Sequence, residues 1–138
     1  MASTEQDARK TTALMTAKSL MVSLTVGDLQ RSLRFYTEGL GFGVEASHER
    51  DGEVRYYALR AGECQLGIGQ DDWAKGRDRV KGVGMRIYIS TDQDVHEIAK
   101  RVQSAGFKVD SGPEPLPWGP MAFHLTDPDG FLLTVGND

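Results

Sequence analysis

The feature of this sequence that most limits its fold is an internal repeat with an offset of 65 residues. Alternating apolar residues over 20–26 are followed by a helical pattern and by the dipeptide Gly41-Phe42. The same order recurs over 85–89, with a second helical pattern and then Gly106-Phe107. A constant offset through a strand, a helix and an exit turn indicates that one structural unit has been duplicated.

Each repeat predicts a βαβββ module. In the first, a strand over 20–26 precedes an amphipathic helix whose N-cap is Asp28, and three β segments follow. In the second, Val109 opens a strand, a proline-rich loop spans 111–120, and two strands flank the turn Asp127-Pro128-Asp129-Gly130. The other expected strands cover residues 44–49, 54–60, 64–68, 121–126 and 131–135.

The repeat also sets the domain organisation. Residues 1–17 are polar without a sustained period and predict a flexible tail, and residues 18–138 predict a single domain. Within this domain, module one spans 18–70, a polar linker spans 71–82, and module two spans 83–138.

Charge and composition argue against several classes of function. The 16 Lys and Arg residues are scattered among 20 Asp and Glu residues, so nucleic-acid binding is not expected. No apolar run approaches the ~20 residues of a spanning helix, so we expect no membrane partner. The single Cys64 cannot form an internal disulfide, which is typical of a cytoplasmic protein. Its place within a strand, without basic neighbours, favours a buried and unreactive thiol.

Two groups of residues carry a resemblance to a known family. The first group is Val26-Gly27-Asp28-Leu29, Ser32-Leu33, Phe35-Tyr36 and Leu40-Gly41-Phe42. The second group is Trp118-Gly119, Phe123 and Asp127-Pro128-Asp129-Gly130. In order and spacing they resemble the two module signatures of the vicinal oxygen chelate superfamily, which includes glyoxalase I, extradiol dioxygenases, fosfomycin-resistance proteins and bleomycin-binding proteins. The resemblance covers about residues 18–138. It implies an α+β fold of two βαβββ modules forming an open cup-shaped sheet, with the site in the cup and often completed by a homodimer.

The resemblance also implies where a metal ion would be held. Metal-dependent members place a His or Gln on the first strand, a His at the equivalent place in module two, and a Glu on the last strand. The matching positions here are Met21, Arg86 and Thr134. An ungapped count would put Met85 in place of Arg86, but Met85 belongs to the apolar face of its strand.

A thioether, a guanidinium and a hydroxyl are poor ligands for a divalent metal. We therefore expect neither a metal ion nor another cofactor. The remaining alternative is a shifted metal site built from His48, Glu49 and His124.

The expected ligand site is then a cup in which Arg86 and His124 are the polar anchors, with Tyr88 and a tryptophan providing flat apolar area. The full set of expected ligand-binding residues is Met21, Ser23, Trp73, Arg86, Tyr88, Trp118, His124 and Thr134. An unpaired guanidinium in a concave, partly apolar surface predicts an anionic or carbonyl-bearing small molecule. Two alternatives stay open: Arg86 ties the modules together through Glu45, Glu49 or Glu53, and each tryptophan only anchors its loop.

Three functions are compatible with these residues. The favoured one is a small-molecule-binding protein without a catalytic metal or catalytic residue. The second is a glyoxalase-like enzyme: a metal-dependent lyase, dioxygenase or thiol transferase with shifted ligands, or a metal-free catalyst with His124 as base. The third is an auxiliary domain whose cup is filled by its own side chains. In each case the exposed sheet edges predict a homodimer.

Overall fold

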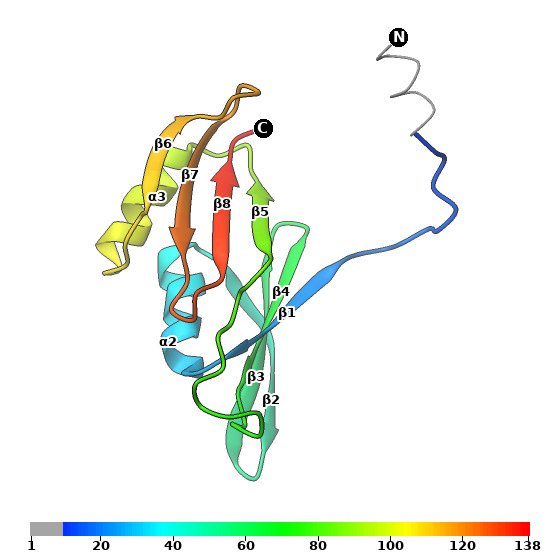
Figure 1. Ribbon diagram of the computed structural model, residues 1–138, viewed down its shortest axis with the longest axis vertical. Helices are drawn as coiled ribbons and strands as arrows, with labels where there is room; N and C mark the ends of the chain where they lie inside the picture. Colours follow the sequence, from blue (N-terminus) through cyan, green and yellow to red (C-terminus); the bar gives the residue numbers. More distant parts are fainter. Residues whose placement is uncertain (1–9) are drawn as a thin grey trace.

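The computed structural model, which describes residues 10–138, contains two four-stranded sheets, each with a helix on one face (Figure 1). The first sheet consists of β1 (Met21–Val26), β2 (Gly43–Arg50), β3 (Glu53–Ala61) and β4 (Cys64–Gln70). The second consists of β5 (Arg86–Ser90), β6 (Ser111–Pro115), β7 (Met121–Thr126) and β8 (Leu132–Gly136). The helices are α2 (Leu29–Arg34), continued by a π-helical turn (Phe35–Gly39), and α3 (Val95–Ser104).

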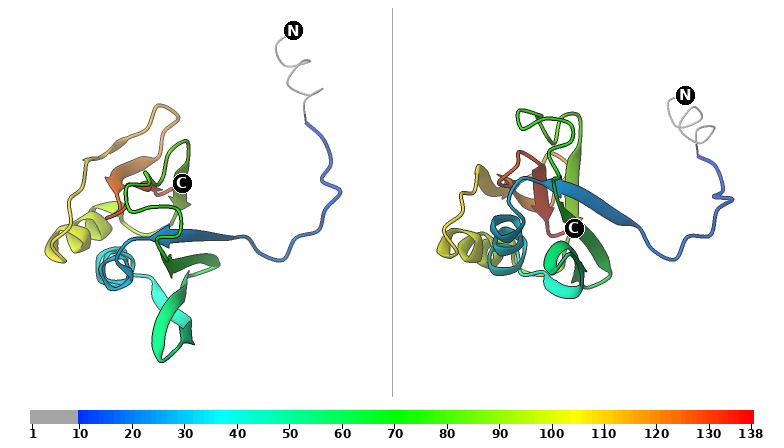
Figure 2. Two further views of the ribbon diagram at one scale, coloured as in Figure 1. Left: turned by 60° about the horizontal axis from the view of Figure 1, so that its bottom comes forward. Right: turned by 90° about the horizontal axis from the view of Figure 1, so that it is seen from below.

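The two sheets have the same topology. Their strand orders are β1-β4-β3-β2 and β5-β8-β7-β6, and in each sheet the first two neighbours are parallel. Ser23 on β1 lies opposite Gly67, and Tyr88 on β5 lies opposite Thr134. The predicted α+β fold of two βαβββ modules is confirmed, and Figure 2 shows both helices on the same side of the molecule.

The predicted periodicities determine which face of each element is buried. On β1, Leu24 and Val26 are buried while Ser23 and Thr25 are exposed. Helix α3 buries one apolar stripe, consisting of Val95, Ile98, Ala99 and Val102. The Asp28 side chain accepts a hydrogen bond from the Arg31 backbone N–H at 3.2 Å, as expected for the N-cap of α2.

Two carboxylates of the β7–β8 turn connect module two to module one. The buried Asp127 accepts a hydrogen bond from the Tyr36 hydroxyl at 2.7 Å through Oδ2. The Asp129 carboxylate accepts from the Gly27 backbone N–H at 2.8 Å and from the Ser32 hydroxyl at 3.3 Å. We call these five residues the carboxylate clasp. It joins the two groups of residues that carry the family resemblance.

Three sequence predictions about module two were wrong in detail. Val109 does not open a strand; instead β6 lies in the expected proline-rich loop. Prolines are tolerated here because β6 is an edge strand that pairs only with β7. No strand on its outer side needs the N–H groups that Pro113 and Pro115 lack. Met85 is 38% exposed rather than buried, because β5 begins at Arg86 and Met85 lies in the connection before the strand.

The connection between the modules has neither helix nor strand over residues 71–85, but it is held in place. Asp71 is buried and forms ion pairs with Lys81 at 2.9 Å and with Arg79 at 3.3 Å. The hydrogen bond from Lys81 lowers the pKa of Asp71 below its ordinary value. These ion pairs close the linker on itself, and the Asp71 backbone N–H donates to the Val26 carbonyl at 2.8 Å, which ties the first linker residue to β1.

The tail prediction is tested only in part. Residues 10–17 are exposed and have no helix or strand, and the first nine residues lie outside the described part of the chain. Within residues 10–138, no helix has the length and apolar character needed to span a membrane.

Candidate ligand-binding site

Three of the expected site residues are hydrogen-bonded to one another on the face of the second sheet that carries no helix. Arg86 on β5 donates from Nη1 to Thr134 Oγ1 at 3.1 Å, and His124 Nδ1 on β7 lies 2.8 Å from the same oxygen. Thr134, on the intervening strand β8, is only 2% exposed. Because Thr134 Oγ1 accepts from Arg86, its proton is available to His124 Nδ1 in the tautomer that carries its proton on Nε2.

The Arg86 guanidinium has no carboxylate partner in the described part of the chain. Every ion pair within 4.0 Å involves other residues: Glu45 pairs with Arg60 at 3.0 Å, and Glu53 pairs with Arg55 at 3.2 Å. The alternative in which Arg86 ties the modules together through these glutamates is therefore wrong for a single chain. Within residues 10–138, the charge of Arg86 is therefore not neutralised by an ion pair.

Tyr88 lies on the same face, two residues after Arg86 on β5. It lies opposite Thr134 across the parallel β5–β8 pair, and its hydroxyl donates to Asp138 Oδ1 at 3.0 Å. Desolvation, followed by the Asp138 contact, raises the pKa of the Tyr88 hydroxyl. Tyr88 is still 39% exposed.

The corresponding face of the first sheet carries Met21 and Ser23, both exposed on β1. It also carries a residue that the sequence analysis missed. Tyr56 on β3 directs its hydroxyl to Met21 Sδ at 4.0 Å, and its ring lies 5.7 Å from that of His48 on β2. The available signal was the pair of glycines at 67 and 69 in β4, which makes room for a ring on this face.

The two tryptophans lie apart from this cluster. Two cations approach the Trp73 ring, with Arg77 Cζ 4.7 Å and Lys81 Nζ 5.4 Å from its centre. Trp118 is 66% exposed in the β6–β7 connection, which lies at the opposite end of the molecule from the 71–85 connection (Figure 1). In residues 10–138, no hydrogen bond or aromatic contact joins either tryptophan to Arg86, Thr134 or His124.

The residues of the shifted metal alternative are not brought together within the described chain. Among residues 10–138, no three His, Cys, Asp or Glu side chains come together in an arrangement that could hold a metal ion. His48 is paired with a tyrosine ring on the first sheet, and His124 is hydrogen-bonded on the second.

Comparison with known proteins identifies the family. Residues 18–135 match the family model described as the Glyoxalase/Bleomycin resistance protein/Dioxygenase superfamily. The chain belongs to this superfamily. A curated relative, "Probable lactoylglutathione lyase, chloroplastic" of Arabidopsis thaliana, is 30% identical over 123 residues. That alignment covers 80% of this chain but 33% of the relative, so the chain spans about a third of the relative's length.

Solved structures of the superfamily share the fold. A member from Sphaerobacter thermophilus is 27% identical, with a TM-score of 0.69, and the match covers 91% of this chain and 100% of the other. TnmS3 of Streptomyces sp. CB03234, described as an antibiotic binding protein, is 24% identical, with a TM-score of 0.67 and coverage of 91% and 98%. At 24% identity, the likeness to TnmS3 establishes the fold and does not identify the ligand of this superfamily member.

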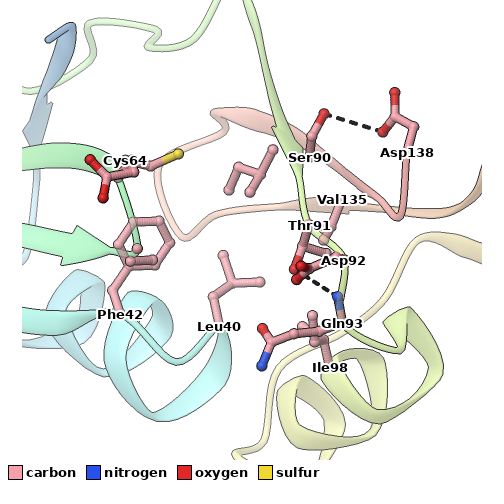
Figure 3. Close-up of a pocket in the computed structure, with 14 residues that line it drawn as sticks. Leu40, Phe42, Cys64, Ser90, Thr91, Asp92, Gln93, Ile98, Val135 and Asp138 are labelled. Atoms are coloured by element: carbon pink, nitrogen blue, oxygen red, sulfur yellow. Dashed lines mark hydrogen bonds between the residues drawn. The ribbon is translucent and has the colours of Figure 1, made fainter. Parts of the chain in front are cut away.

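A separate cavity of about 700 Å³ lies between the modules, where the β3–β4 turn faces the β5–α3 connection (Figure 3). Phe42 and Cys64 lie across it from Ser90 and Asp92, and none of the expected site residues lines it. Cys64 is exposed here, so the expectation of a buried thiol was wrong. The reason is its position at the first residue of β4, directly after the turn and beyond the cover of the helices.

Proposed function

We propose that this superfamily member binds a small anionic organic molecule on the helix-free faces of its sheets, without a resident metal ion. The observation that carries the proposal is the Arg86–Thr134–His124 cluster, in which a guanidinium without a carboxylate partner is fixed by a buried hydroxyl. By the family resemblance, Arg86 and Thr134 stand where metal ligands would be, and a permanent cation at one of them opposes a second positive charge.

The cluster selects ligands that carry acceptor oxygens. Arg86 uses one of its five N–H groups on Thr134, so the others remain for a two-point contact with a carboxylate, phosphate or enolate. With Nδ1 turned to Thr134, His124 Nε2–H becomes a further donor. The antibiotic-binding description of TnmS3 supports a binding function on this fold.

We propose further that the protein acts as a cytoplasmic homodimer. The cytoplasmic location rests on Cys64, an exposed thiol with no second cysteine in the chain for a disulfide. The dimer rests on β1 and β5, which are edge strands whose outer sides are unpaired and which bear the partly exposed Met21 and Tyr88. A second copy would cover these edges and enclose the ligand.

The dimer predicts a simple result. Size-exclusion chromatography with light scattering at micromolar concentration should give twice the chain mass of 15.2 kDa. The mass should be unchanged in the presence of chelator, because the interface we propose uses strand edges and not a bridging metal. A mass of one chain would contradict the dimer.

The absence of a resident metal predicts that Zn²⁺, Mn²⁺, Ni²⁺ and Fe²⁺ each leave the melting temperature within about 1 °C of its starting value. A ligand that binds the folded state tightly must raise this temperature by mass action. Differential scanning fluorimetry with and without chelator measures the effect. A rise of several degrees that chelator reverses would show that the metal-free part of the proposal is mistaken.

A second function, a glyoxalase-like lyase, is supported by the description of the Arabidopsis relative. The same titration separates the two functions, provided that each metal-treated sample is also assayed with methylglyoxal and glutathione. Metal-dependent turnover would favour the lyase, and a stable protein without turnover would favour binding.

A further inference from the structure

We infer that residues 10–18 of each copy of this chain lie in a groove between the two modules of a second copy. This inference rests on the proposed homodimer and names the segments that form its contact. We call residues 10–20 the arm. Figures 1 and 2 show the arm leaving the start of β1 and running away from both sheets.

The groove consists of two adjoining cavities. The first is the cavity of about 700 Å³ between the modules (Figure 3), and the second has about 280 Å³. Phe42, Glu63, Cys64 and Ile89 line both, so the two cavities are continuous, and we call them together the intermodule groove. The second cavity is bounded by β1 and β4 on one side and by β5 on the other, and its apolar lining is Leu20, Val22, Phe42, Leu66, Ile87 and Leu133.

The arm has an apolar centre that its own copy does not cover. Leu14 is 99% exposed and Met15 is 82% exposed. Residues 10–20 contain neither Gly nor Pro, so nothing in the arm favours a tight turn back toward the groove of its own chain. In the proposed dimer, the groove of the second copy is the apolar surface that can cover this centre.

The charges of the arm and the groove are complementary. The groove is lined by three carboxylates, Glu63, Asp92 and Asp138, and among the described residues no Lys, Arg or His lines either cavity. In residues 10–138, none of the three carboxylates belongs to an ion pair within 4.0 Å. The arm carries Lys10 and Lys18 and no Asp or Glu. An apolar segment between two cations therefore matches an apolar groove with an acidic rim.

The spacing within the arm fits an extended segment. In an extended chain alternate residues share one side, so Leu14 projects on the same side as Lys10 and Lys18, each four residues away. Leu14 would then enter the groove while the lysines reach its rim. The backbone of the arm can also be paired, because β1 and β5 are edge strands with unpaired outer sides. Tyr88 lines the second cavity, so the arm of the second copy would border the candidate ligand site.

The native Cys64 provides a direct test, because it lines both cavities of the groove. In the variant Leu14→Cys, diamide takes up two electrons and two protons from a pair of thiols that meet, and a disulfide forms. Most of the protein should then migrate as a covalent dimer on a non-reducing gel. Peptide mass spectrometry should show Cys64 of one copy joined to residue 14 of the other.

The matched control is Val80→Cys, which places a thiol at another exposed apolar position, 76% exposed and outside the arm. Under the same oxidation this variant should give only a small fraction of linked dimer. Wild-type protein, whose single thiol is Cys64, should behave in the same way.

Leu14→Ser tests the contact without a covalent bond. The substitution removes an apolar anchor from both arms of the dimer, so light scattering over a concentration series should show a dimer Kd raised at least about tenfold. Val80→Ser should leave this Kd within about twofold. Lys18→Glu should raise it by about threefold at low salt and by less at high salt, because rim charges are screened.

The outcomes separate this inference from the homodimer. A wild-type mass of one chain at every concentration overturns the homodimer and the arm contact together. A dimer in which the residue-14 thiol does not join Cys64, or joins Cys64 of its own chain, overturns the arm contact and leaves the homodimer in place. An unchanged Kd for Leu14→Ser has the same meaning. Linkage to Cys64 of the other copy, with a weakened Leu14→Ser dimer, supports the inference.

Discussion

Arg86→Met is expected to abolish most of the affinity for carboxylate ligands while leaving the fold intact. In the free protein the guanidinium makes one hydrogen bond, to Thr134, and no ion pair within the described residues. Removing the guanidinium should weaken carboxylate binding by about 2–5 kcal/mol, or at least about 30-fold in Kd, because the anion loses a charged hydrogen-bond donor. Titration with 2-naphthoate measures the loss, and Arg86→Lys should recover part of it through charge alone.

The control for Arg86→Met is Arg55→Met, which removes the same charge from an exposed pair with Glu53. Its effect on Kd should stay within about twofold, because surface ion pairs contribute little and charges at a distance are screened. An Arg86→Met protein with unchanged Kd and a clearly lower melting temperature would mean that Arg86 supports the scaffold, and the proposed site would have to be given up.

Asp127→Ala is expected to be the most destabilising single substitution considered for this chain. The Asp127 carboxylate, 4% exposed, accepts from the Tyr36 hydroxyl at 2.7 Å and from the backbone N–H groups of Asp129 and Phe131, both at 2.9 Å. Alanine would leave two buried donors and one half-buried donor without an acceptor, which costs about 3–5 kcal/mol of unfolding free energy. Asp110→Ala, an exposed control, should cost less than about 1 kcal/mol.

Asp127→Asn keeps the acceptor for the two backbone groups, so urea denaturation should show a smaller loss than for alanine. The asparagine variant also reveals a pH dependence. Desolvation raises the pKa of Asp127 above its ordinary value, and no cation pairs with it in the described residues. Its contribution to stability is therefore complete below the ordinary pKa and is lost as the pH rises through the raised one.

The expected result is that wild-type protein gains stability relative to Asp127→Asn as the pH falls through the acid range. Asp71 and Asp94 have lowered pKa values, so their contributions to stability have the opposite pH dependence. These contributions are the same in both proteins and cancel when the two unfolding free energies are subtracted. A difference that shrinks on acidification would show that the hydrogen bonds to the ionised carboxylate outweigh its burial.

The fold was predictable because the strand–helix pattern occurs twice in the sequence. The alternation over 20–26 and the stripe of α3 each give the buried face directly, and the fixed offset excludes most other topologies. Strand β6 was missed because its prolines oppose strand formation locally, and only its edge position, a tertiary property, makes them tolerable.

The arrangement of the candidate site residues was predictable in the second module only. Strand alternation and the resemblance placed Arg86, His124 and Thr134 on one face, and the structure joins them by hydrogen bonds. The contact of Tyr56 with Met21 could not be found in this way, because it depends on the pairing of β3 with β4, where Tyr56 lies opposite Gly69. Trp73 was misleading because the pattern showed an aromatic residue in a polar loop and could not show that Arg77 and Lys81 contact its ring.

The carboxylate clasp bears on how far a family assignment can be taken. Tyr36, Ser32 and Gly27 of one module meet Asp127 and Asp129 of the other, so these positions are constrained jointly by the requirement that the halves dock. They are also the positions by which such a chain is recognised, and none of them touches the Arg86–Thr134–His124 cluster. Divergent relatives can therefore keep the recognisable motif intact while exchanging one chemistry for another on the far side of the sheet.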